Sequence, residues 1–119
     1  MAANWRLFCP RSWDDTTLSD PDQVAAVRER RERAGIPDEV RHREKWRLAL
    51  DMLDEMIEQW GLPKLPVTAD SGYGDCALFR LGLAERGLRY VVQVDPAATA
   101  HPADAVTVAP PYTGRGRLP

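Results

Sequence analysis

Asp70 is the residue best placed for chemistry in this sequence. It follows the apolar segment 65–69, where β-branched and small residues alternate as in a half-buried strand, and it precedes the Gly-Tyr-Gly triplet 72–74. Ligands of open α/β sheets bind outside the carboxyl ends of the strands. A carboxylate at this point is therefore a candidate metal ligand or general base, although the spacing alone equally allows one that only caps a turn.

Two further carboxylates stand near Asp70 in the expected fold. Asp75 is predicted to be the N-cap of the next helix. Asp95 ends the following strand and could approach Asp70 across a parallel sheet, but Asp-Pro is also an ordinary strand terminator, so this pairing stays open. Metal-dependent phosphoryl transfer needs several oxygen ligands. A phosphate-accepting role for Asp70 is a third reading, without companion residues in the sequence.

The remaining polar residues suggest no complete catalytic set. Asp14 and Asp15 are adjacent, so their side chains point apart, and we expect solvated turn acids in preference to a metal pair. Cys9 and Cys76 are distant, which argues against zinc and predicts free thiols. The sequence contains no P-loop, no Gly-x-Gly-x-x-Gly and no Ser-His-Asp order. His101 has no visible partner.

Length and composition are those of one small soluble domain. The chain has 119 residues, of which 44% are hydrophobic and 29% charged. Its net charge of -2 does not indicate a nucleic-acid-binding protein as a whole, although local patches can still bind. No apolar run approaches the roughly 20 residues that span a bilayer, and the N-terminus lacks the plan of a signal peptide. We therefore expect no membrane partner and a cytoplasmic location.

Helical and strand patterns alternate along the chain and predict an α/β fold with a mostly parallel small sheet and flanking helices. The expected strands are 4–9, with both faces partly covered, 65–69, and 89–94, with both faces covered. The expected helices are 21–34, 43–60 and 76–86, the last with Leu78, Phe79, Leu81 and Leu83 as core candidates. The strongest signal is the apolar stripe of the second helix, formed by Trp46, Leu50, Leu53, Ile57 and Trp60.

The charged half of the first helix, residues 28–33, is expected to be a solvated face with i,i+4 ion pairs, and a nucleic-acid surface is the secondary reading. The second and third helices should end at Gly61 and Gly87. After residue 94 the chain is rich in proline and small residues, with one short strand possible at 105–109. In its basic end, Arg115 and Arg117 could contact DNA phosphate, or the end could be a loose linker.

Segment 65–74 resembles the second-aspartate motif of bacterial insertion-sequence transposases of the DDE type. That motif is an apolar strand, then Ala-Asp, a small residue and Gly-Tyr-Gly, and here Ser71 stands where alanine is usual. Residues 5–13, 34–37, 90–94 and 110–117 resemble the same family, as does the amphipathic helix before the motif. The resemblance therefore covers nearly the whole chain.

The resemblance implies an incomplete RNase H-like fold. Residues 1–94 would be the central part of the catalytic domain, and residues 95–119 a Pro/Gly-rich tail that starts an insertion or linker. The implied activity is Mg²⁺-dependent DNA strand cleavage and transfer at transposon ends. Asp70 would be the catalytic and metal-binding second aspartate, with the first aspartate and the glutamate outside this sequence.

With one of three carboxylates, the chain is expected to be inactive alone. Its partners would be DNA, through the full-length enzyme, and a full-length transposase. The alternative is a non-catalytic binding or regulatory module derived from a transposase.

Overall fold

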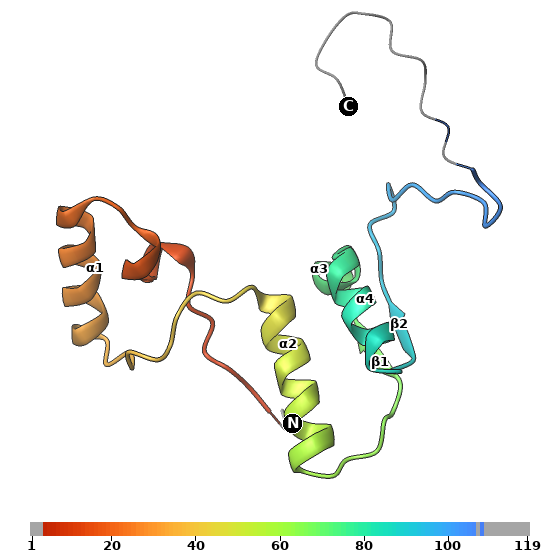
Figure 1. Cartoon of the computed structure of the whole chain (residues 1–119), viewed down its shortest axis with the longest axis horizontal. Helices are drawn as coiled ribbons and strands as arrows, with labels where there is room; N and C mark the ends of the chain where they lie inside the picture. Colours follow the sequence, from red (N-terminus) through yellow and green to blue (C-terminus); the bar gives the residue numbers. More distant parts are fainter. Residues whose placement is uncertain (1–3, 107, 109–119) are drawn as a thin grey trace, which may run out of the picture.

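The computed structural model describes residues 4–106 and 108, and it places short helices around a small sheet (Figure 1). The elements in chain order are the 3-10 turns η1 (Arg11–Trp13) and η2 (Asp15–Thr17), α1 (Pro21–Arg33), α2 (Lys45–Asp54) with its π-helical continuation η3 (Glu55–Gln59), β1 (Val67–Ala69), α3 (Ser71–Gly74), α4 (Ala77–Glu85) and β2 (Tyr90–Val92).

The sheet consists of β1 and β2, which run parallel with Val67 opposite Tyr90 and Ala69 opposite Val92. Both α3 and α4 lie in the connection between the two strands. A parallel pair needs such a crossover because a short turn cannot return the chain to the same end of the sheet. The predicted α/β fold with a small parallel sheet and flanking helices is confirmed.

The apolar core joins α2, α4 and the sheet. Its buried members are Leu50, Phe79, Leu83 and Leu88, with half-buried side chains of β1, β2 and α2 around them. Figure 1 shows α1 on one side of α2, and α3, α4 and the sheet on the other. Four buried side chains form the centre of this cluster, so the core of the described part is small.

The helix ends follow the predicted local chemistry. The Asp20 carboxylate accepts the N–H of Asp22 at the start of α1, and Pro21 occupies the first helical position. Gly61 and Gly87 have φ values of 67° and 64°, so each adopts the left-handed conformation that ends its helix at low steric cost. No helix of the described part is long and apolar enough to cross a bilayer.

The predicted strand at 4–9 is wrong, because this stretch forms no strand in the structure. A strand requires a hydrogen-bonded neighbour, and the described sheet is complete with β1 and β2. Trp5 is 75% exposed, in contrast to the expected partial coverage. The stretch is instead held by polar contacts, because Asn4 and Arg6 both donate to the Glu55 carboxylate.

Four apolar residues predicted to be buried are exposed. Val91 is 74% exposed, because Val92 packs on the core and neighbouring strand residues point to opposite faces, so only one face of β2 is covered. The others are Leu78, Leu81 and Trp60. The possible strand at 105–109 does not form at Ala105, Val106 or Val108, and its other two positions lie outside the described residues.

Candidate functional site

Asp70 lies directly after β1, at the carboxyl end of the strand, as predicted. Its backbone carbonyl accepts the N–H of Tyr73 at 3.2 Å and of Gly74 at 2.8 Å, which starts α3. Its side chain makes no capping hydrogen bond and the residue is exposed. The carboxylate is therefore not used as a helix cap and is left available to a ligand.

Close packing of α3 against β2 fixes the backbone around Asp70. A methyl group built on Gly74 would lie 1.8 Å from the carbonyl oxygen of Gln93 and 3.1 Å from Cβ of Val92. The Arg80 guanidinium also donates to the carbonyl oxygen of Gly74. Only a residue without a side chain fits at this contact, so Gly74 sets the position of the short helix that follows Asp70.

Asp75 and Asp95 are engaged elsewhere. The prediction that Asp75 caps the next helix is wrong: the N-cap of α4 is Cys76, because α3 and its turn occupy the residues before it. Asp75 Oδ1 instead accepts the N–H of Asp95 at 2.7 Å, and Asp95 Oδ1 accepts the N–H of Ala97 at 2.7 Å. Two loops at the carboxyl end of the sheet are joined in this way.

The described part of the chain therefore does not form a complete metal site. It contains no group of three or more His, Cys, Asp or Glu side chains that could hold an ion. Asp70 supplies one carboxylate where a divalent ion such as Mg²⁺ takes about six oxygen ligands. The residues present do not by themselves fit a two-ion site.

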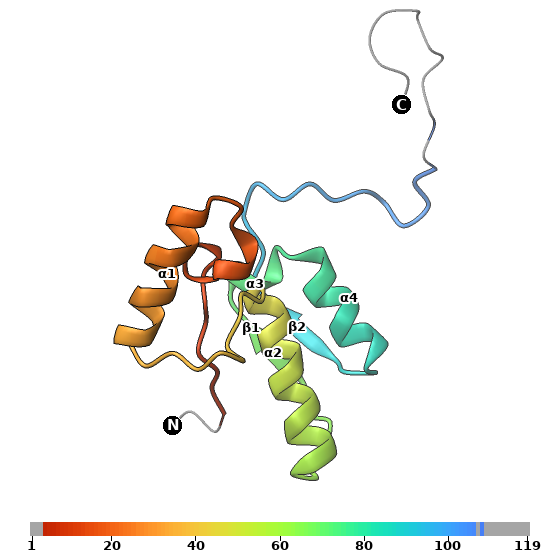
Figure 2. The same ribbon diagram turned by 60° about the vertical axis from the view of Figure 1, so that its left-hand side comes forward.

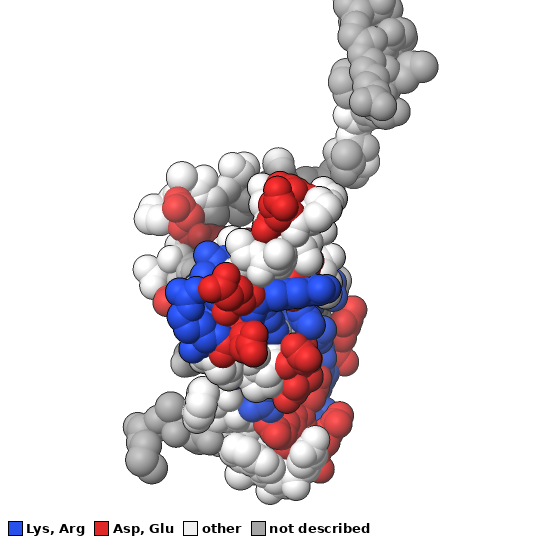
Figure 3. Space-filling view, turned by 90° about the vertical axis from the view of Figure 1, so that its left-hand side faces the viewer, with Lys and Arg blue, Asp and Glu red and all other residues white. Residues whose placement is uncertain are grey.

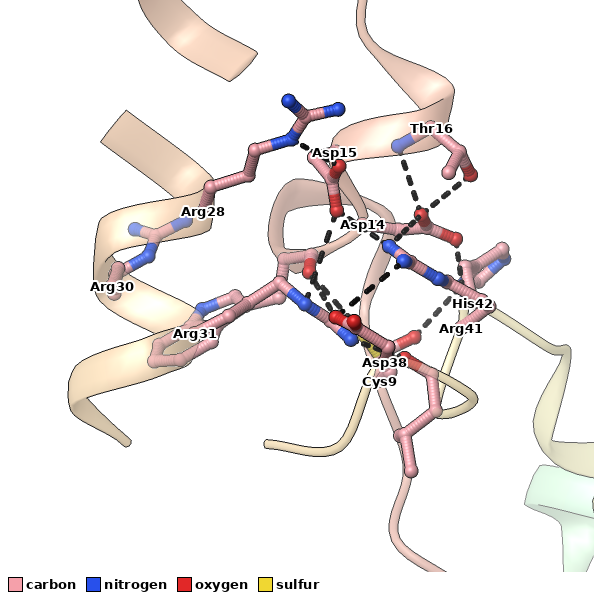
Figure 4. A network of polar contacts seen from close by, with 12 residues as sticks. Cys9, Asp14, Asp15, Thr16, Arg28, Arg30, Arg31, Asp38, Arg41 and His42 are labelled. Atoms are coloured by element: carbon pink, nitrogen blue, oxygen red, sulfur yellow. Dashed lines mark hydrogen bonds and ion pairs between the residues drawn. The ribbon is translucent and has the colours of Figure 1, made fainter. Parts of the chain in front are cut away.

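A second cluster, which we call the Asp14–Asp15 network, lies between η1, η2, α1 and the segment before α2 (Figure 4). Asp14 and Asp15 are only 2% and 6% exposed, so the prediction of solvated turn acids is wrong. The Asp14 carboxylate accepts the N–H and the hydroxyl of Thr16 at 3.0 and 2.6 Å, and the N–H of His42 at 2.7 Å.

Arginines neutralise the second carboxylate of the network. Arg28 Nε donates to Asp15 Oδ2 at 2.9 Å, and Arg41 donates to Asp15 Oδ1. Arg31 Nε lies 3.9 Å from Asp15 Oδ1. Buried carboxylates persist in proteins when they are paired and hydrogen-bonded in this manner.

Arg31 itself is only 3% exposed, so the prediction of a solvated charged face on α1 is wrong at this residue. Its guanidinium donates to the carbonyls of Trp13, Pro37 and Val40 at 2.8, 2.9 and 2.6 Å. A signal was present in the sequence, because Arg31 continues the helical face of Val24 and Val27.

The expected solvated pairing does occur on α1 between Glu29 and Arg33, at 2.8 Å. Figure 3 shows the Lys and Arg band on the face that α1 covers, with acidic side chains among it.

Both network carboxyls have lowered pKa values. Burial raises the pKa of Asp14, but hydrogen bonds from Thr16 and His42 and the charge of Arg41 outweigh it. The pKa of Asp15 falls to about 2, chiefly through the hydrogen bond from Arg28 and also through Arg41.

Asp15 should therefore make stability dependent on pH in the acid range. A carboxyl whose pKa is lower in the folded state stabilises the fold above its ordinary pKa of 3.8, and this contribution is lost as the pH falls through 3.8 toward about 2. We expect the urea midpoint to fall over this range, and the fall to be smaller in Asp15→Asn. Glu39→Gln, which changes an exposed acid, should titrate like the wild type, and an unchanged titration in Asp15→Asn would contradict the expectation.

A comparison with known protein families identifies the family of this chain. The model of the family described as DDE superfamily endonuclease matches residues 1–119. The chain belongs to this family. The resemblance to DDE-type transposases is thereby confirmed, and the α/β fold agrees with the RNase H-like fold of the superfamily. No curated protein and no solved structure matched.

Within this DDE superfamily member the predicted DNA-binding residues Arg115 and Arg117 lie outside the described residues, so their role stays a prediction. Both cysteines are free, as predicted, with Cys9 buried beside the network. The network was missed because its partners are separated by up to 28 residues in the sequence. No local sequence pattern predicts a contact between residues that are so far apart.

Proposed function

We propose that Asp70 is a catalytic, metal-binding carboxylate for Mg²⁺-dependent DNA strand cleavage and transfer at transposon ends. The supporting observation is that the Asp70 carboxylate is exposed at the carboxyl end of β1 and caps no helix. The family match that includes Asp70 spans the chain. Residues 1–94 then belong to the catalytic domain, and residues 95–119 form a tail that starts an insertion or linker.

The contribution of this chain is to hold one carboxylate in place. The backbone of Asp70 is fixed by the start of α3, and α3 is fixed against β2 through Gly74. Because one carboxylate cannot assemble a site for two ions, the chain alone is inert as a nuclease. Cleavage requires further carboxylates in addition to those described.

A metal-binding measurement and a nicking assay test this proposal together. Titration of ¹⁵N-labelled protein with Mn²⁺ should broaden the amide signals of residues 70–74, and Asp70→Asn should abolish that broadening. Asp75→Asn is the matched control and should retain it, because the Asp75 carboxylate is engaged with Asp95. Supercoiled DNA should stay intact with Mg²⁺ or Mn²⁺.

Two outcomes would overturn the proposal. Broadening that is the same in wild type and Asp70→Asn would remove the metal-binding role. Nicking that depends on Asp70 would show that the chain is active alone, although the described residues form no group of three or more metal-ligating side chains.

The alternative function is a non-catalytic binding or regulatory module whose partner is a full-length transposase. The observation that favours it is the exposure of large apolar side chains on the N-terminal stretch and on β2, including Trp5 and Val91. Exposed apolar surface of this kind is typical of sites that pair with another protein. Inhibition of strand transfer by an intact family transposase, with no nicking by this chain, would favour the module.

A further inference from the structure

A shallow hollow of about 280 Å³ lies where η1 meets the segment that leads into α2. Its lining consists of Arg11, His42, Arg43, Glu44 and Arg47. Three guanidiniums and an imidazole thus surround one carboxylate, in a chain whose overall net charge is -2. We call it the basic hollow.

The Asp14–Asp15 network assembles the basic hollow from distant parts of the sequence. The Asp14 carboxylate accepts the N–H of His42 at 2.7 Å, and His42 Nδ1 lies 2.9 Å from the carbonyl oxygen of Cys9. These contacts hold the segment around His42 against the turn that carries Arg11. Arg11 and Arg43 line one hollow as a result, although 32 residues separate them.

The cations of the basic hollow are available to an outside anion. Arg43 pairs with Asp51 at 2.6 Å, and Arg47 lies 3.6 Å from Glu44, but all four side chains are at least 40% exposed. Exposed ion pairs contribute little to stability and exchange readily. Arg11 takes part in none of the salt bridges found among residues 4–106 and 108.

The start of α2 carries more positive charge than the helix dipole favours. The first turn of α2 carries Lys45 and Arg47 and no acid, although the partial charge of a helix N-terminus is positive. Like charges gathered around one hollow add to this repulsion. Glu44 at the N-cap of α2 and Asp51 offset part of this repulsion, and the positive charge that remains is available to an anion.

Aromatic rings support the cations next to the basic hollow. The ring of Phe8 contacts both His42, at 6.2 Å between ring centroids, and Lys45, whose Nζ is 4.9 Å from its centroid. The Arg47 guanidinium lies 5.0 Å from the ring of Trp46. These contacts orient long side chains and reduce the entropy that they lose when an anion binds.

We propose that the basic hollow is a contact site for the sugar-phosphate backbone of duplex DNA. Several separate guanidiniums suit a row of phosphates, and backbone contacts of this kind give affinity without sequence specificity. Both ribbon views place the start of α2 at the same end of the molecule as α3, which follows Asp70 (Figures 1 and 2). The choice of DNA as the polyanion rests on the proposed function.

Fluorescence anisotropy with a labelled DNA duplex tests the site on the full chain. The measurement is made in EDTA over a range of salt concentrations, so it requires neither metal nor Asp70. Combined substitution of Arg11→Gln, Arg43→Gln and Arg47→Gln should weaken binding by about tenfold or more and lower the salt slope by about two to three. The control Arg33→Gln, Lys64→Gln and Arg89→Gln removes the same charge elsewhere and should stay within about twofold of wild type.

A gain-of-affinity variant keeps the test decisive if the triple variant folds poorly. Glu44→Gln removes the one acid of the basic hollow, and Glu44 makes no side-chain cap for α2. It should tighten DNA binding by about twofold or more. Unchanged or weaker binding by Glu44→Gln, or equal losses in the triple variant and its control, would overturn the proposal.

The basic end of the sequence, with Arg115 and Arg117, provides the third comparison of DNA binding. If Arg115→Gln with Arg117→Gln abolishes binding while the triple variant keeps it, DNA binds at the tail and the basic hollow is excluded. Binding that persists in Asp70→Asn and falls in the triple variant supports the basic hollow. Failure of the Mn²⁺ response at residues 70–74 would count against the proposed function alone.

Discussion

Arg31→Met should destabilise the protein by about 3–5 kcal/mol, because it removes one partner from a buried charged network. The substitution removes the guanidinium donor from the backbone carbonyls of Trp13, Pro37 and Val40. The Pro37 carbonyl still accepts the N–H of Val40, and the Trp13 carbonyl still accepts the Cys9 thiol. It also takes a positive charge away from the buried Asp15 carboxylate. Urea unfolding followed by circular dichroism and by tryptophan fluorescence measures the loss.

The part of the fold that Arg31→Met destabilises should be as informative as the size of the loss in stability. All partners of Arg31 lie between Cys9 and Val40, whereas the apolar core is formed by residues of α2, α4 and the segment before β2. Amide hydrogen exchange should therefore accelerate in α1 and leave α4 protected. The matched control is Arg33→Met on the same helix, which breaks an exposed pair and should cost less than about 0.5 kcal/mol. Similar losses in both variants would contradict the structural role of Arg31.

Gly74→Ala should destabilise the fold by about 2–3 kcal/mol, since overpacking forces the backbone to shift. The added methyl group would lie 1.8 Å from the Gln93 carbonyl oxygen, and a backbone atom cannot rotate away as a side chain can. Because Gly74 ends α3, the shift should also move Asp70 and change the Mn²⁺-induced broadening of residues 70–74. Thermal unfolding and the same titration provide the two readouts.

The control for Gly74 lies two residues earlier in the same turn. A methyl group on Gly72 would meet only the Asp70 carboxylate, at 3.2 Å, and that side chain is exposed and free to rotate. Gly72→Ala should therefore change stability by less than about 1 kcal/mol. A Gly74→Ala protein as stable as Gly72→Ala would show that α3 does not depend on its contact with β2.

Two different kinds of interaction hold the two parts of this chain. The part around α1 is held by buried ion pairs and by the hydrogen bonds of Arg31, with Val27 and Cys9 as its buried apolar residues. The part with α2, α4 and the sheet is held by an apolar cluster around Leu83. Acid should weaken both parts, because the pKa values of Asp14 and Asp15 are lowered in the first and those of Asp54 and Glu55 in the second.

Local chemistry in the sequence determined the helices, their caps and the position of Asp70. The stripe of Leu50 and its neighbours, the cap at Asp20 and the glycine ends depend on residues within a few positions of one another. The strand-end aspartate and its Gly-Tyr-Gly triplet are equally local, and with their flanks they indicate the family from the sequence alone.

The tertiary structure alone decided which polar groups are buried and which strands form. Asp14 and Asp15 are buried because guanidiniums from distant segments neutralise them, and no pattern in the sequence encodes that meeting. Segment 4–9 has strand-like residues but no strand to pair with, so its backbone forms none. Asp75 has the residue type of a helix cap and instead binds the loop after β2. In each case the outcome depends on a long-range partner, whose presence only the folded chain determines.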